Sequence, residues 1–166
     1  EAALERKASA GGGTVDDEAL RKLHGRELAA RSRALLAQTA QSRERWHALQ
    51  KSTDPHDPRT AYLRDIAVHV RLTDAQQAAG QAGADYGDAL AKESPPPVLH
   101  TTEAAYARAQ VDLRLATLEM QLASVNFEIS KREGLDNDPD LPGLRKEKAQ
   151  LESELQTARA ATRPAK

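Results

Sequence analysis

The chain has 166 residues, the length of one ordinary domain, and carries 24 basic and 25 acidic side chains for a net charge of −1. The two signs are mixed along the chain, so no segment is basic enough to follow nucleic-acid phosphates, and we expect no nucleic-acid partner. The absence of cysteine excludes a disulfide framework, a thiolate metal site and a cysteine nucleophile.

The apolar content favours a thin core. Leu, Ile, Val and Phe together make up 29 of the 166 residues, below the usual globular level, but they recur periodically. This pattern favours an elongated helical bundle over a compact globule. No apolar run is long enough for a membrane span, and the first residue is Glu1 rather than Met. Because a native chain would begin with Met, we expect an excised domain or a processed chain.

The N-terminal region predicts a linker followed by a long helix. Residues 1–13 end in a glycine run and are expected to form a flexible segment. Thr14 and Asp17 resemble a capping box, which predicts that the first helix begins at about residue 15. A broad apolar stripe then continues to Leu49, giving a helix of about 37 residues.

A second helix is expected from about Pro58 to Lys92. Its second half contains Gly80, Gly83 and Gly87, each of which weakens a helix by about 1 kcal/mol relative to alanine. We favour a face of small residues that lets a neighbouring helix approach closely, with a kink or hinge as the alternative. The prolines at 95–97 are expected to end this helix.

The third helix is expected to begin at Thr101 or Thr102 and to reach about Glu133, and it has two apolar stripes. Alternating steps of four and three residues define a first stripe, called here the seam, which consists of Val111, Leu115, Leu118, Leu122, Val125 and Ile129. A second stripe on roughly the opposite side recurs every seven residues and consists of Tyr106, Leu113, Met120 and Phe127. A helix that is apolar on two sides needs two partners.

The fourth helix matches the seam of the third. Its apolar residues Leu144, Leu151 and Leu155, followed by Ala158, have complementary spacing. An antiparallel fold-back would pair Ile129 with Leu144, Leu122 with Leu151, Leu118 with Leu155 and Leu115 with Ala158. The sequence thus predicts an all-α, elongated antiparallel four-helix bundle with coiled-coil-like packing, a single domain over 14–163 made of two helical hairpins, 14–93 and 101–163.

The second stripe has two possible covers. The first hairpin of the same chain could cover it, which would close the bundle and leave a monomer. A second copy of the chain could also cover it, because the first helix offers only one, interrupted stripe. We favour the monomer over the homo-oligomer.

Three patterns suggest chemistry, and each has a simpler explanation. Glu44 and His47 have the E-x-x-H spacing of di-iron bundles, but the required second motif is absent, so we expect a surface histidine. Asp136, Asp138, Asp140 and Glu147 fit positions of a calcium loop, but Leu141 replaces the required glycine, so Asp138 or Asp140 is better explained as a helix cap. Asp65 and His69 could form a solvated helical pair. We predict no catalytic residue, no metal and no cofactor.

Alternating helices would bring the turns at 52–57 and 134–141 to the same end. The sequence predicts an acidic tip there, around His56, that would attract a basic partner surface; it consists of Asp54, Asp57, Asp136, Asp138 and Asp140.

These patterns together favour a non-catalytic helical module for protein–protein interaction or assembly. An Ala- and Arg-rich composition with long helices is common in bacterial assembly and secretion-associated proteins, although no motif here identifies a family. The alternative is a membrane- or host-targeting helical domain of a secreted toxin or effector. Binding to anionic liposomes would distinguish the two.

Overall fold

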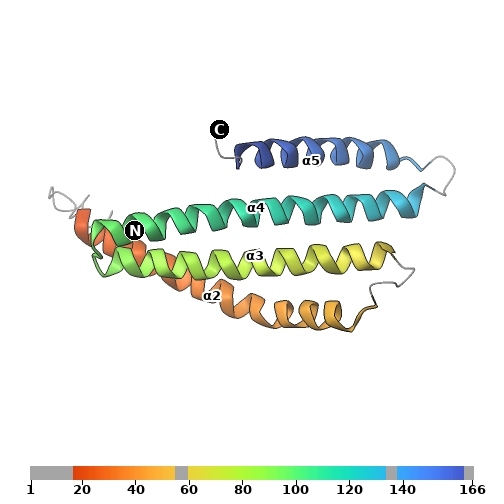
Figure 1. Cartoon of the computed structure of the whole chain (residues 1–166). Helices are drawn as coiled ribbons and strands as arrows, with labels where there is room; N and C mark the ends of the chain where they lie inside the picture. The colour runs from red at the N-terminus through yellow and green to blue at the C-terminus, as the bar shows by residue number, and fades with distance from the viewer. Residues whose placement is uncertain (1–16, 55–59, 134–137, 163–166) are drawn as a thin grey trace. The chain divides into compact units, whose positions relative to one another are not determined.

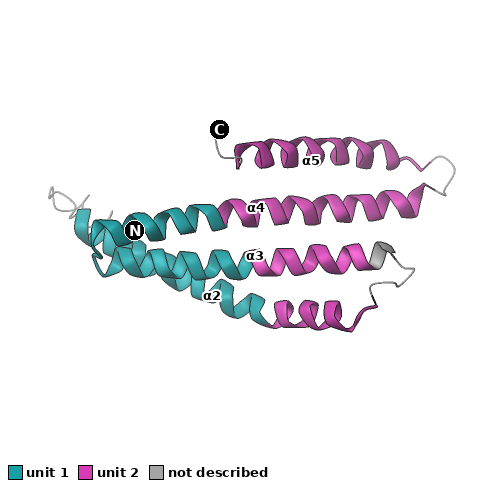
Figure 2. Cartoon of the chain, in the orientation of Figure 1, with its two compact units in different colours: residues 1–40, 76–109 teal, residues 41–75, 110–166 magenta. Residues whose placement is uncertain are grey.

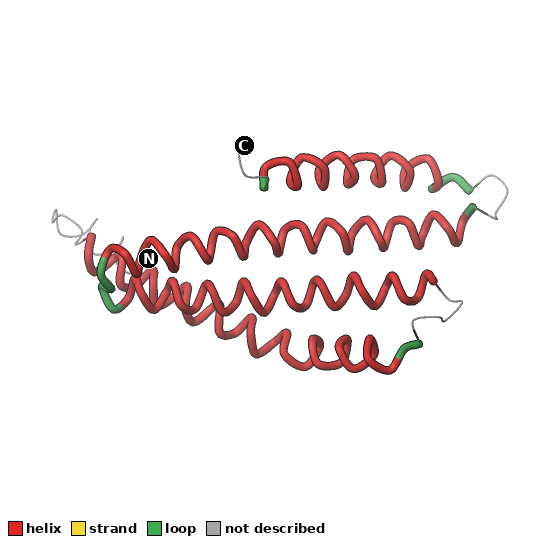
Figure 3. Tube along the Cα trace, in the orientation of Figure 1, coloured by secondary structure: helices red, strands yellow, loops and turns green. Residues whose placement is uncertain are grey.

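The computed structural model describes residues 17–54, 60–133 and 138–162. These residues form four helices and no strand: α2 (Asp17–Ser52), α3 (Thr60–Ala91), α4 (Pro96–Arg132) and α5 (Leu141–Ala161) (Figures 1 and 3). Contacts join consecutive helices, so the predicted all-α helical bundle is confirmed. The expected linker at 1–13 lies outside the described residues.

The chain divides into two compact units (Figure 2). Unit 1 comprises residues 1–40 and 76–109, and unit 2 comprises residues 41–75 and 110–166. Helices α2, α3 and α4 each contribute one segment to each unit, whereas α5 belongs wholly to unit 2.

In unit 1, α2 and α3 approach each other through small residues. A Cβ atom added at Gly25 would lie 2.6 Å from the carbonyl oxygen of Gly87, and one added at Gly87 would lie 2.6 Å from the backbone nitrogen of Ala29. Ser32 of α2 is buried beside Gly83 of α3 in the same way. α3 continues through all three of its glycines. The glycines of α3 therefore allow the close approach of α2, which the sequence analysis favoured over a kink or hinge.

Polar contacts lie along the same α2–α3 contact in unit 1. The Gln77 amide donates a hydrogen bond of 2.9 Å to the carbonyl oxygen of Leu36. Arg33 forms an ion pair of 2.7 Å with Asp88. The hydrogen bond from Arg33 is the main cause that lowers the pKa of Asp88. Both contacts fix the register of the two helices.

The predicted start of the third helix at Thr101 or Thr102 is wrong, because α4 begins at Pro96. Proline has no backbone N–H and a fixed φ, and both properties suit the first helical turn, where N–H groups have no helical partner. α3 ends just before in a Schellman motif, with Glu93 at φ 53° and the Ser94 N–H bonded to the carbonyl oxygen of Ala89 at 3.0 Å. The Schellman motif therefore ends α3, and the prolines that follow it open α4.

In unit 2, α4 and α5 share an apolar core. Its buried members are Leu118, Val125, Ile129, Leu151 and Leu155, with Leu115, Leu122, Leu141, Leu144 and Ala158 packed against them. Ion pairs on the flank join Glu119 to Arg159 and Glu133 to Arg145, an order of contacts that antiparallel neighbours make. Every seam residue except Val111 lies in this core.

The turn into α5 differs from the capping prediction. Asp140 occupies the N-cap position, but its side chain makes no capping hydrogen bond. It binds the guanidinium of Arg132 at 2.6 Å instead. Asp138 accepts a hydrogen bond of 2.8 Å from the Asp140 N–H, which forms a local turn, and Pro142 lies in the first turn of α5.

Candidate interaction surface

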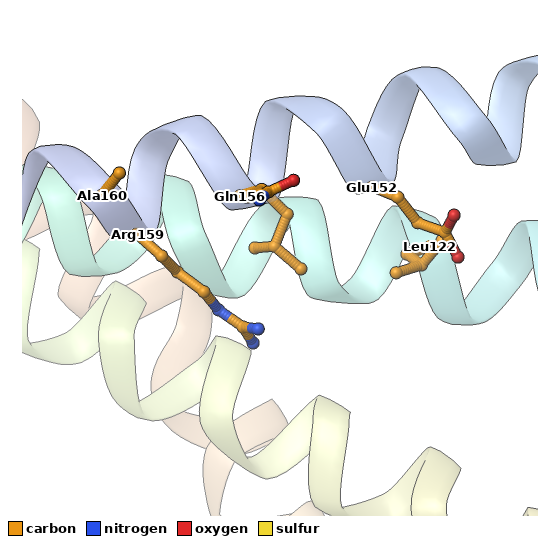
Figure 4. A pocket seen from close by; sticks show the side chains of 6 residues that line it. Leu122, Glu152, Gln156, Arg159 and Ala160 are labelled. Atoms are coloured by element: carbon orange, nitrogen blue, oxygen red, sulfur yellow. The ribbon is translucent and has the colours of Figure 1, made fainter.

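A hollow of about 470 Å³ opens between α4 and α5 in unit 2 (Figure 4). Its apolar floor consists of Leu122 of α4, which is partly buried, and Leu155 of α5, which is buried. The remaining lining residues come from one face of α5, at helical spacings of three and four, and are Glu152, Gln156, Arg159 and Ala160. The hollow therefore has an apolar floor and a polar rim.

The spacing of charged residues beside the α4–α5 core explains where the hollow forms. On α4, Glu119, Asn126 and Glu133 recur every seven residues, and on α5 Arg145, Glu152 and Arg159 do the same. The outer pairs bind across the two helices, Glu119 with Arg159 at 2.7 Å and Glu133 with Arg145 at 3.5 Å. In this register Asn126 lies opposite Glu152, and an amide cannot form an ion pair. The middle position, where Glu152 lines the hollow, therefore lacks an ion pair between the two helices.

Glu152 instead lies 3.9 Å from Lys148 on its own helix. Its side chain is 54% exposed. An exposed i, i+4 pair of this kind contributes only about 0.3–0.5 kcal/mol. Glu152 is thus weakly held at the rim of the hollow.

Glu119 binds two arginines on different helices. Its carboxylate accepts from Arg159 of α5 at 2.7 Å and from Arg71 of α3 at 3.0 Å. The carboxylate side chain is 23% exposed, whereas the two guanidinium side chains are more than half exposed. Figure 4 shows Arg159 extending away from α5 past α4. Two positive charges here share one negative charge.

Val111 continues the line of apolar seam residues on α4 beyond the shared core. It is 40% exposed, and the core ends at Leu115 and Ala158. In the predicted register the residue opposite Val111 would be Thr162, just past the end of α5 at Ala161. The α4 seam therefore leaves an exposed apolar residue where α5 stops.

The second stripe is covered unevenly. Tyr106 stacks on Tyr86 of α3 within unit 1, with ring centroids 5.8 Å apart. Leu113 and Met120 are half-buried, and Phe127 is 57% exposed with the Lys131 ammonium 4.0 Å from its ring centroid. Burial, followed by the charge of Glu103, raises the pKa of Tyr86.

The predicted acidic tip is only partly described. Asp57 and Asp136 lie outside the described residues, and Asp54 is exposed. Asp138 and Asp140 both bind Arg132, at 3.4 and 2.6 Å. The hydrogen bond to Asp140, followed by the charge of Asp138, raises the pKa of Arg132. Sequence reasoning overlooked this arginine, which neutralises part of the predicted acidic charge.

His47 and His69 of unit 2 take part in contacts between α2 and α3. The expected surface residue His47 is only 31% exposed, and its Nε2 lies 2.8 Å from Asp74, which also binds Arg43 at 2.6 Å. Burial acts to raise the pKa of Asp74, but the hydrogen bonds with His47 and Arg43 outweigh it, so the pKa is lowered. Trp46 stacks on His69 with ring centroids 3.8 Å apart.

His69 also makes the expected contact with Asp65, at 3.4 Å. Within the described ranges, no group of three or more His, Asp or Glu side chains is placed to hold a metal ion.

Comparison with known proteins gives no relative: neither a protein-family model, nor a curated protein, nor a solved structure matches this chain. Among the helices that the structure describes, none has an apolar stretch long enough to cross a lipid bilayer.

Proposed function

We propose that the chain is a non-catalytic helical module for protein–protein interaction or assembly, and that the α4–α5 hollow binds its partner. One observation carries the proposal. The hollow exposes part of Leu122, beside the buried Leu155, between polar side chains on the outside of a helix pair. A groove of this form suits an amphipathic helix, whose apolar face would cover the floor.

The use of the polar side chains in unit 2 supports a role in binding rather than catalysis. Asp74 holds α2 to α3 through Arg43 and His47. Glu119 connects α4 to both α3 and α5. These contacts place the carboxylates in ion pairs between helices, while Leu122 in the hollow remains partly exposed.

A pair of matched tryptophan substitutions tests the proposal. Ala160 is exposed and lines the hollow, so Ala160→Trp would fill it without entering the core. Ala149 is also exposed, lies on the same helix three turns earlier and does not line the hollow, so Ala149→Trp is the control. The native chain and both variants would be used to capture partners from extracts of the cells that make the protein.

We expect at least one protein to bind the native chain and Ala149→Trp but not Ala160→Trp, and to bind again when purified. Circular dichroism of all three proteins would verify equal helix content. A partner set that is the same for all three proteins would refute the hollow as the binding surface. Turnover by the purified chain that Ala160→Trp abolishes would refute a non-catalytic role.

A further inference from the structure

We infer that the partner of the hollow is an acidic amphipathic helix, whose apolar face contacts the partly exposed Leu122 and whose carboxylates bind Arg159 and Arg71. This inference rests on the proposed function and adds the chemistry of the partner. Its basis is the unequal charge beside the hollow, where two guanidinium groups share one carboxylate.

Arg71 and Arg159 each keep N–H donors that do not bind Glu119 and that a partner could use. Arg71 contacts Glu119 through Nε, and Arg159 contacts it through one terminal nitrogen. A guanidinium has five N–H donors, so each arginine retains donors directed elsewhere. Their side chains are 56% and 59% exposed. An incoming carboxylate can therefore bind without displacing Glu119.

The other charges at this surface leave the balance positive. Glu152 at the opposite end of the rim lies beside Lys148. Across Arg71, Arg159, Lys148, Glu119 and Glu152, three positive charges meet two negative charges. Charge complementarity thus favours a negative partner, with the acid placed at the Arg159 end of the hollow and away from Glu152.

The hollow has room for apolar side chains of a partner helix. Its volume is about 470 Å³, and two of its lining residues are leucines. An apolar side chain of a partner helix would enter it, and acidic residues three or four positions away would lie over the rim.

Two synthetic helical peptides of about 20 residues test the charge preference. The first has leucines along one face, flanked by glutamates, and the second has lysine in place of every glutamate. Fluorescence anisotropy would measure their binding to the full chain and to two variants. Arg159→Gln removes the charge at the hollow, and Arg145→Gln removes a matched arginine fourteen residues earlier on α5 that also pairs with an α4 glutamate.

We expect the acidic peptide to bind more tightly than the basic one. Arg159→Gln should weaken acidic-peptide binding by about three- to tenfold, and Arg145→Gln by less than about twofold. Raising NaCl from about 50 to about 500 mM should weaken the acidic peptide and reduce its dependence on Arg159.

Equal binding of the two peptides, equal effects of the two substitutions, or no binding of the acidic peptide at about 1 mM would each overturn the inference. None of these results affects the comparison of Ala160→Trp with Ala149→Trp. Failure of the acidic-partner inference is therefore distinguishable from failure of the proposed function.

Discussion

The close approach of α2 and α3 in unit 1 makes a quantitative prediction for Gly87→Ala. The new Cβ would lie 2.6 Å from the backbone nitrogen of Ala29 and 2.6 Å from the carbonyl oxygen of Gly25, whereas ordinary contact begins at 3.4 Å. The backbones must therefore separate by about 0.8 Å at this point. A gap of about 0.5–1 Å removes a quarter to a half of the van der Waals attraction energy of each local contact.

Two opposing effects set the size of the change. Overpacking typically costs about 1–3 kcal/mol, and the upper end applies because backbone atoms cannot rotate away. Replacing a helical glycine by alanine returns about 1 kcal/mol. We therefore expect Gly87→Ala to lower the free energy of unfolding by about 2 kcal/mol, or Tm by about 4–8 °C.

Gly143→Ala provides the matched control. A Cβ at Gly143 in α5 would meet no atom within 4 Å. This substitution should raise the free energy of unfolding by up to about 1 kcal/mol through helix propensity alone. Thermal and urea unfolding followed by circular dichroism would measure both variants. If Gly87→Ala stabilised the protein as Gly143→Ala does, the close approach of α2 and α3 would be refuted.

Two further predictions concern unit 2, and a third concerns the mixed charge of the whole chain. Leu151→Ala in the shared α4–α5 core should cost about 3 kcal/mol in urea unfolding, whereas Val111→Ala, at a 40% exposed position, should change stability by less than about 0.5 kcal/mol; similar costs would contradict the described core. Because the pKa of Asp74 is lowered in the fold, its stabilising contribution is present above its unfolded pKa and lost as pH falls through the lower folded value, so the stability difference between native and Asp74→Asn should shrink as the pH falls below the ordinary aspartate pKa of about 3.9; a difference that stays constant there would contradict the ion pair. Anionic liposomes should not carry the chain in a flotation assay, because its charges are mixed in sign; clear co-flotation would favour the membrane-targeting alternative.

Helix positions and the shared core were predictable because apolar spacing carries that information. The seam on α4 and the matching leucines on α5 are set by helical periodicity, which is local. The start of α4 was not predicted correctly, because Pro96 can either end one helix or open the next. That choice depends on Glu93, whose positive φ closes α3 just before the prolines.

The hollow could have been found only by reading both helices in register. The sequence places Asn126 opposite Glu152, between two positions where opposite charges face each other across α4 and α5. The spacing of apolar residues does not reveal this mismatch. The sequence could not predict that the Glu119 carboxylate binds arginines from two helices. This arrangement depends on Arg71 of α3, and the distance between α3 and α4 is a property of the packed unit.

The most direct test of the proposed function is the ratio of dissociation constants that a captured, purified partner shows for Ala160→Trp and for the native chain, measured by isothermal titration calorimetry. Filling the hollow should raise the dissociation constant at least about tenfold, as expected when a central apolar contact is lost, while Ala149→Trp should leave it within about twofold. A ratio below about twofold for Ala160→Trp, with helix content unchanged, would contradict binding at the hollow.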